Sequence, residues 1–138
     1  MEKMSRNQEN FIIMTVVYDE LSDYTLGNNK LFRDVDEIIT EVSEIPFKEH
    51  SYYVQTCITS VLDHYGEIVS VFHPHLNNWK WERLPLLTQA VLLMSYAHFH
   101  YVEKIDKRIV INVAVELAKK YIEEKQAKFI NAILDEVL

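Results

Sequence analysis

Glycine, proline and cysteine are scarce in this sequence, and each shortage excludes a class of structure. The 138 residues include two glycines, three prolines and one cysteine. A sheet with many hairpins needs turn residues that are missing here, so long helices joined by short loops suit the composition better. The single cysteine, Cys57, excludes an intrachain disulfide and indicates a reducing, cytoplasmic location. Because it lies among apolar residues, we expect a buried thiol and no nucleophile.

Long hydrophobic runs are also missing. The first ten residues, MEKMSRNQEN, are polar, and the apolar stretch 11–17 that follows is too short to cross a bilayer. We therefore expect no membrane association. The length fits one domain, 1–138, and the apolar share of 49% is enough for a packed core.

Charge is unevenly spread along the chain. The net charge is −7, with five basic and thirteen acidic residues in 1–68 and nine basic and eight acidic residues in 69–138. The first half therefore repels polyanions, whereas the second half tolerates them.

Apolar spacing and end signals predict an all-α fold. The predicted helices span 6–26, 31–44, 50–71, 85–101, 107–122 and 125–137, with a short turn or helical piece at 76–83.

Local signals set several of these helix ends. Ser5 is a predicted N-cap with Gln8 three residues later, which is a capping-box pattern, and Asp106 is a second predicted N-cap. Gly27-Asn28-Asn29 predicts the end of the first helix. Gly66 predicts a bend inside the third.

Four segments of the second half carry a family resemblance. They read NWKWERL, AVLLMSYAHF, VINVAVELAKKY and KFINAILDEVL, in this order from residue 78 onward. The third contains an (I/V)N-x-A-(V/I)ELAK pattern and the last a KF(V/I)N-x-(V/I)LD pattern. Order and spacing resemble the C-terminal half of NusB transcription antitermination factors. In the first half, Arg6 stands before Val17-Tyr18 in a layout similar to the family's arginine-rich start.

The resemblance implies a NusB-like bundle of about seven helices in two sub-bundles, about 1–72 and 73–138. It implies no enzymatic activity and no cofactor. It also implies a role in ribosomal RNA transcription, in which family members bind boxA RNA together with a small-subunit ribosomal protein on the RNA polymerase complex.

The chain departs from the family pattern at several polar positions. Leu93, His98 and Val113 stand where the family has an arginine and two glutamates, and Ala132 replaces a glycine. Buried charges usually occur in pairs, because a buried charge without its partner is costly. The joint loss of the arginine and the two glutamates therefore indicates that apolar packing has replaced an internal polar network.

Candidate binding residues follow from the resemblance. RNA would meet Lys3 and Arg6 at the N-terminus and a lysine cluster near the last two helices. The cluster comprises Lys119, Lys120, Lys125 and Lys128, of which Lys119, Lys125 and Lys128 are the predicted RNA contacts. A solvated terminus and ordinary surface lysines are the alternatives. The protein partner would meet Tyr18, Arg83 and Leu84, although Tyr18 serves equally well as a core tyrosine.

Other conspicuous residues favour structural interpretations. His98 and His100 point in different directions on a helix, and neither they nor His73 and His75 predict a metal site. For the aromatic residues Tyr52, Tyr53, Trp79 and Trp81, packing is favoured over stacking on unpaired bases. Asn112 and Asn131 are predicted to be buried amides that tie helix ends together.

Two functions from different classes remain. The first is a NusB-like antitermination factor that binds boxA-type RNA and a ribosomal protein. The alternative is a protein–protein adaptor, or a homodimer through an apolar helix face, that has lost RNA binding. In the adaptor, Asp19, Glu20, Asp34 and Glu37 would face a basic partner. A detached accessory domain of an RNA methyltransferase ranks third, because no cofactor motif is present.

Overall fold

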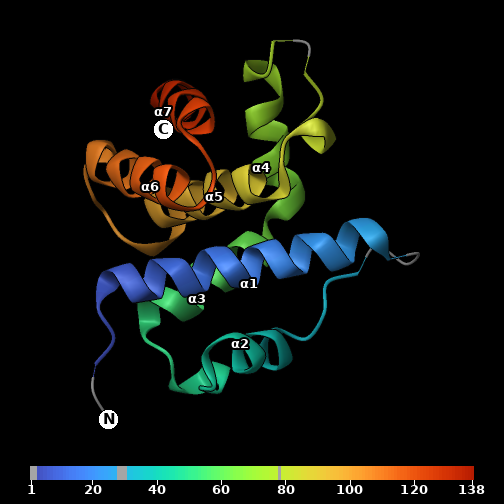
Figure 1. Ribbon diagram of the computed structural model, residues 1–138, viewed down its shortest axis with the longest axis vertical. Helices are drawn as coiled ribbons and strands as arrows, with labels where there is room; N and C mark the ends of the chain where they lie inside the picture. Colours follow the sequence, from blue (N-terminus) through green and yellow to red (C-terminus); the bar gives the residue numbers. More distant parts are fainter. Residues whose placement is uncertain (1–2, 28–30, 78) are drawn as a thin grey trace.

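The computed structural model describes residues 3–27, 31–77 and 79–138, and the regular structure in these ranges is entirely helical (Figure 1). The predicted all-α fold class is confirmed. The α-helices are α1 (Arg6–Leu26), α2 (Val35–Ser43), α3 (Tyr52–Asp63), α4 (Tyr65–Phe72), α5 (Leu86–Ala97), α6 (Lys107–Tyr121) and α7 (Glu124–Val137). Three 3₁₀ turns, η1 (Phe47–Glu49), η2 (His73–His75) and η3 (Trp81–Arg83), and one π-helical turn, η4 (His98–Val102), join them.

Helix α1 begins at the predicted capping box. The Ser5 hydroxyl accepts the backbone N–H of Gln8, and the Ser5 N–H donates to the Gln8 side chain at 2.8 Å. At the other end, the N–H of Gly27 donates to the carbonyl of Asp23. The predicted stop at Asn28 and Asn29 lies outside the described residues.

Helix α2 is shorter than predicted. The sequence predicted a helix from residue 31, but the structure begins it at Val35, with Asp34 as N-cap. The backbone N–H of Arg33 donates to the side chain of Glu20 on α1 instead of entering a helix. This long-range contact holds Arg33 against α1, just before α2 begins.

The predicted helix 50–71 is broken, and the break is not at Gly66. The chain leaves helical geometry at His64, with φ −115° and ψ 18°, which separates α3 from α4. Gly66 lies inside α4, where an added Cβ would meet nothing within 4 Å. The predicted helix 85–101 is α-helical only as far as Ala97, and its last turn widens into the π-helical η4.

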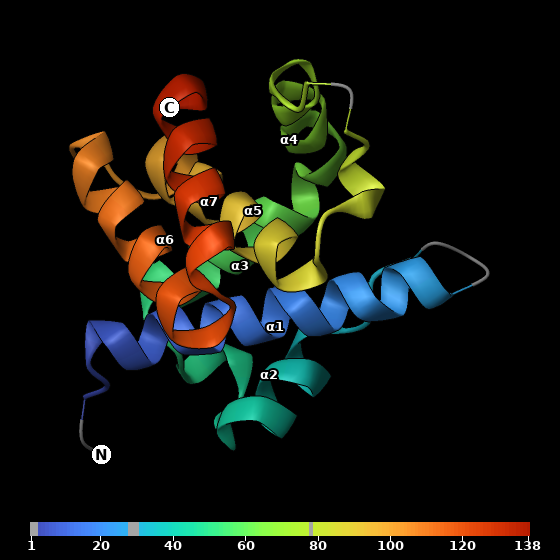
Figure 2. The same ribbon diagram turned by 45° about the horizontal axis from the view of Figure 1, so that its top comes forward.

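Helix α5 forms the centre of the molecule. Every residue from Thr88 to Ser95 is buried, as expected for a helix that is apolar on all sides. It packs against α1 and α3 on one side and against α6 and α7 on the other. Figures 1 and 2 show α1 crossing the molecule, with α2 on one side of it and the α6–α7 hairpin on the other. No helix in the described ranges is long and apolar enough to span a membrane.

Candidate nucleic-acid interface

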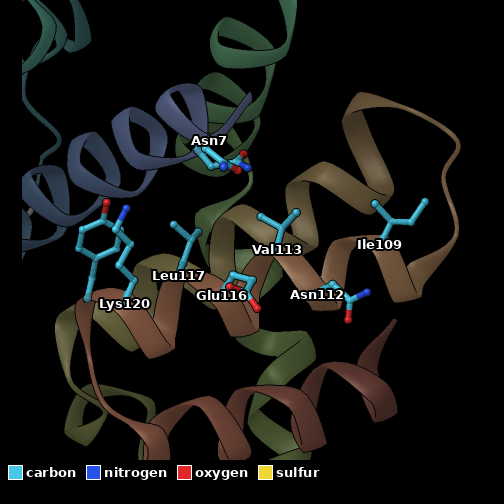
Figure 3. Close-up of a pocket in the computed structure, with 9 residues that line it drawn as sticks. Asn7, Ile109, Asn112, Val113, Glu116, Leu117 and Lys120 are labelled. Carbon is cyan, nitrogen blue, oxygen red and sulfur yellow. The ribbon is translucent and has the colours of Figure 1, made fainter. Parts of the chain in front are cut away.

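A groove separates the N-terminal half of α1 from α6 (Figure 3). It encloses about 410 Å³. Its lining residues are Asn7, Asn10, Ile109, Asn112, Val113, Glu116, Leu117, Lys120 and Tyr121. Figure 3 shows Asn7 on α1 facing the row of α6 side chains. The groove combines amide groups and apolar side chains with one lysine, Lys120, and one glutamate, Glu116, which suits an extended ligand with polar edges.

A second hollow lies on the other flank of the start of α1. It encloses about 360 Å³ and shares Asn7, Lys120 and Tyr121 with the first groove. The Tyr121 ring packs against Phe11 of α1, with ring centroids 5.1 Å apart. The end of α6 therefore presents the cation of Lys120 and the ring of Tyr121 to both hollows, with Phe11 of α1 against that ring.

The predicted RNA contacts are all at the surface. Lys3 is exposed just before α1, Lys119 is exposed in the last turn of α6, and Lys125 and Lys128 are exposed in the first turns of α7. None of these four lines the groove between α1 and α6. Lys120 does, and the sequence placed it in the cluster without showing that it faces α1.

Arg6 occupies the first turn of α1 with its side chain about half exposed. Its guanidinium lies over the ring of Tyr53, 3.8 Å from the centroid. Two carboxylates also face it, at 3.4 Å from Nε for Glu9 and 3.6 Å from Nη1 for Glu103. The sequence offered no signal for these contacts, because Tyr53 and Glu103 come from distant segments.

The predicted partner residues differ in exposure. Tyr18 is half-buried on α1 and packs against the core. Arg83 is exposed at the end of η3, whereas Leu84 is buried and its carbonyl accepts a hydrogen bond from Gln89 at 3.0 Å. The side chain of Arg83 is therefore available at the start of α5, whereas that of Leu84 is turned into the core.

The acidic surface of α1 and α2 differs from the expectation in one residue. Glu20 is fully buried and cannot face a partner. Arg33 lies among the surrounding carboxylates, at 3.0 Å from Asp23, 2.5 Å from Glu37 and 3.4 Å from Glu41. The guanidinium of Arg33 thus neutralises part of the negative charge of this surface.

Both motif asparagines are on the surface. Asn112 and Asn131 are exposed, so the prediction that they are buried amides is wrong. Asn112 instead lines the groove beside α1. The repeat pattern identified the helices but did not show which side of each helix faces solvent.

The aromatic residues divide into two groups. Tyr53 and Trp81 are buried, at 5% and 3% exposure, as packing predicted. Tyr52 and Trp79 are exposed, at 70% and 61%, so the prediction that they pack in the core is wrong. Cys57 is fully buried, as expected, and the described residues contain no group of side chains that could hold a metal ion.

The three positions at which this chain replaces a charged residue of the family pattern are only partly apolar. Leu93 is fully buried in the core and Val113 is half-buried. His98 is also buried, but its Nε2 is 2.8 Å from the Glu103 carboxylate and its ring lies edge-on to Tyr53. Polar contacts therefore persist at this position, contrary to the expected apolar replacement.

The comparisons with known proteins agree on one family. The family model described as "NusB family" matches residues 13–138. A transcription antitermination protein NusB from Clostridium botulinum (strain Kyoto / Type A2) is 32% identical over 130 residues, which cover 92% of this chain and 91% of that protein. The corresponding protein of Listeria welshimeri is 30% identical over 100 residues, 72% of this chain and 76% of that protein.

Solved structures show the same fold. T. maritima NusB superposes with a TM-score of 0.81 at 19% identity and covers 99% of this chain and 92% of its own. A structure of the antitermination factors NusB and NusE in complex with dsRNA superposes with a TM-score of 0.75 at 23% identity, and covers 97% of both chains. At these identities the likeness concerns the fold. The match to the family model begins after Lys3 and Arg6.

Proposed function

Because the chain belongs to the NusB family of transcription antitermination factors, we propose that it binds boxA-type RNA together with a small-subunit ribosomal protein. In this role it supports ribosomal RNA transcription by placing both ligands on the RNA polymerase complex, without catalysing a reaction. The observation that carries the proposal is the groove between α1 and α6. Amide groups, Lys120 and Glu116 line this groove, next to the lysine-bearing junction of α6 and α7.

The RNA is proposed to follow this groove and the α6–α7 junction. Lys119, Lys125 and Lys128 would contact phosphates there, and Lys3 and Arg6 would extend the contacts to the start of α1. Phosphate neutralisation supplies much of the affinity of such complexes and makes it sensitive to salt. Amide side chains can in turn hydrogen-bond to the edges of unpaired bases.

The ribosomal protein is proposed to bind at Tyr18 and the start of α5. Arg83 offers an exposed cation there, and Leu84 fixes the turn behind it. The relatives and the complex with NusE and RNA motivate this partner class. The partner would add contacts beyond those of Lys3 and Arg6 at the start of α1.

The test is a titration of the protein into labelled boxA-containing RNA, with and without the ribosomal protein, at two salt concentrations. A scrambled RNA measures selectivity. We expect selective binding that strengthens with the partner and weakens with salt. Joint Lys125→Glu and Lys128→Glu substitution should weaken binding strongly. Lys80→Glu, at an exposed lysine before η3, is the matched charge control for Lys125→Glu alone, which makes the same single exchange of lysine for glutamate. Absence of selective binding at low salt with the partner present would contradict the proposal.

The alternative function is an adaptor that binds proteins, or a homodimer, without RNA. One observation favours it: two carboxylates already face Arg6 at the start of α1. An adaptor would bind a basic protein with an affinity that RNA does not change, and it would not distinguish boxA from scrambled RNA. The same titration therefore separates the two functions.

A further inference from the structure

Arg6 lies in a preformed receptor that this chain builds from three elements. Glu9 belongs to α1 itself, Tyr53 to α3, and Glu103 is the residue that ends η4. The ring of Tyr53 lies under the guanidinium, and the two carboxylates face its Nε and Nη1 atoms. Such a combination of stacking and charge holds an arginine more firmly than a single surface ion pair.

Each part of the receptor is itself fixed. The hydroxyl of Tyr53 donates to Oδ1 of Asn10 at 2.5 Å, and the hydroxyl of Ser51 donates to Glu9. Oε1 of Glu103 is 2.8 Å from Nε2 of the buried His98. This hydrogen bond lowers the pKa of Glu103, and the charge of Arg6 acts in the same direction. Glu103 is therefore a carboxylate throughout the neutral pH range.

The local charge does not favour an anion. Two carboxylates surround one guanidinium, so an approaching phosphate meets a net negative charge at Arg6. The two carboxylates differ in freedom, because the side chain of Glu9 is 11% exposed and that of Glu103 is 43% exposed. Glu103 is thus the carboxylate that a ligand can reach from solvent.

We propose that Glu103 is an intramolecular competitor that holds Arg6 away from nucleic-acid phosphates until RNA displaces it. This inference rests on the proposed function, which it extends by a built-in restraint on affinity. Arg6 is about half exposed, so a phosphate can reach it from solvent once the carboxylate leaves. The restraint makes tight binding depend on additional contacts, including those of the ribosomal protein.

The decisive variant is Glu103→Gln. It keeps an oxygen that can accept a hydrogen bond from His98 and removes only the charge. We expect about threefold to tenfold tighter binding of boxA RNA at low salt, and a salt dependence steeper by about one phosphate contact. Glu82→Gln, at an exposed glutamate in η3, is the remote charge control and should change binding little. Thermal unfolding of both variants checks that the fold is retained.

A double-mutant cycle with Arg6→Gln shows whether the effect passes through Arg6. If Glu103 acts by competition, the gain from Glu103→Gln disappears in the Arg6→Gln background. A gain that persists there is a general charge effect and overturns the inference. Unchanged binding by Glu103→Gln alone also overturns the inference, because the carboxylate would then place no restraint on Arg6. Weaker binding overturns it too, because the carboxylate would then be positioning Arg6 for RNA.

Inorganic polyphosphate serves as a second probe that has no sequence. A gain for polyphosphate that needs Arg6, without selective binding of boxA RNA, supports the competition and contradicts the proposed RNA function. If neither wild-type protein nor Glu103→Gln binds either polyanion at low salt, both the competition by Glu103 and the proposed RNA function are overturned.

Discussion

Glu20 accepts the backbone N–H of Arg33 through Oε1, 2.8 Å from that nitrogen, while its second carboxylate oxygen is buried and finds no hydrogen-bond partner among the described residues. This contact ties α1 to the segment that leads into α2. The side chain of Arg33 forms ion pairs with the surface carboxylates of Asp23, Glu37 and Glu41. Arg33 therefore binds the buried acid through its backbone and the surface acids through its side chain.

Burial raises the pKa of Glu20 to about 7, whereas the N–H of Arg33 and its positive charge act in the opposite direction. The folded protein therefore keeps a proton that the unfolded chain loses near pH 4.5. The contribution of Glu20 to the free energy of unfolding therefore falls as the pH rises from about 4.5 to 7. Above pH 7 this contribution stays constant. Glu20→Gln should raise the free energy of unfolding at pH 8 by about 1–3 kcal/mol.

Urea unfolding at pH 5 and pH 8 measures this effect. Glu116→Gln removes an exposed carboxylate of α6 and serves as the control that should leave the pH dependence unchanged. A Glu20→Gln variant that is less stable than wild type at pH 8 would show that the carboxylate is favourable as an anion, contrary to the argument.

The thiol of Cys57 is expected to be unreactive in the folded protein. Its side chain is fully buried, its Sγ faces the Met94 carbonyl, and burial raises its pKa to about 12. Because the thiolate is the reactive form, an aromatic disulfide reagent should modify native protein only as fast as it unfolds. A Ser70→Cys variant, with a second thiol at an exposed position of α4, supplies the rapid reference reaction. Rapid modification of wild-type protein without denaturant would contradict this burial.

The fold was predictable where local signals decide it. The capping box at Ser5 and the N-cap at Asp106 gave the starts of α1 and α6, because capping needs only neighbouring residues. The start of α2 at Val35 was missed although Asp34 offers a local N-cap signal, whereas the contact between Glu20 and Arg33 depends on tertiary packing and has no such signal. The break at His64 carries no glycine or proline that would mark it in the sequence.

The candidate site was predictable only in part. The family motifs led to the lysines at the junction of α6 and α7, which are exposed as an RNA contact requires. They did not show that Lys120 and Asn112 face α1, because one sequence does not reveal how a helix is rotated against a distant neighbour. The partners of Arg6 were missed for the same reason: the receptor exists only after η4 and α3 meet the start of α1.

A stabilising substitution is expected at Glu44. This residue ends α2 in the left-handed region, with φ 64° and ψ 14°, where glycine has no steric cost. Glu44→Gly should raise the free energy of unfolding by about 0.5–1 kcal/mol, measured by denaturant titration. Glu44→Ala removes the same charge but keeps the side-chain strain, so it should stabilise less. Equal stabilisation by the two variants would assign the effect to the unfavourable charge at the helix C-terminus.

The hydroxyl of Tyr53 is expected to contribute to stability through a buried hydrogen bond. It donates to Oδ1 of Asn10, whose side chain is itself buried. Tyr53→Phe leaves this buried oxygen without its donor, so the free energy of unfolding should fall by about 1–2 kcal/mol. The aromatic ring that supports Arg6 remains in place. Denaturant titration of the variant measures the change.

Tyr52→Phe is the matched control for this substitution, because it removes the same group from the neighbouring residue of the same helix. Tyr52 is 70% exposed, so water replaces any partner that its hydroxyl loses and the stability should change by less than about 0.5 kcal/mol. A difference between the two variants isolates the contribution of the buried hydrogen bond from the general effect of losing a phenol. Equal losses would mean that the contact between Tyr53 and Asn10 adds nothing, and that packing alone holds α3 against the start of α1.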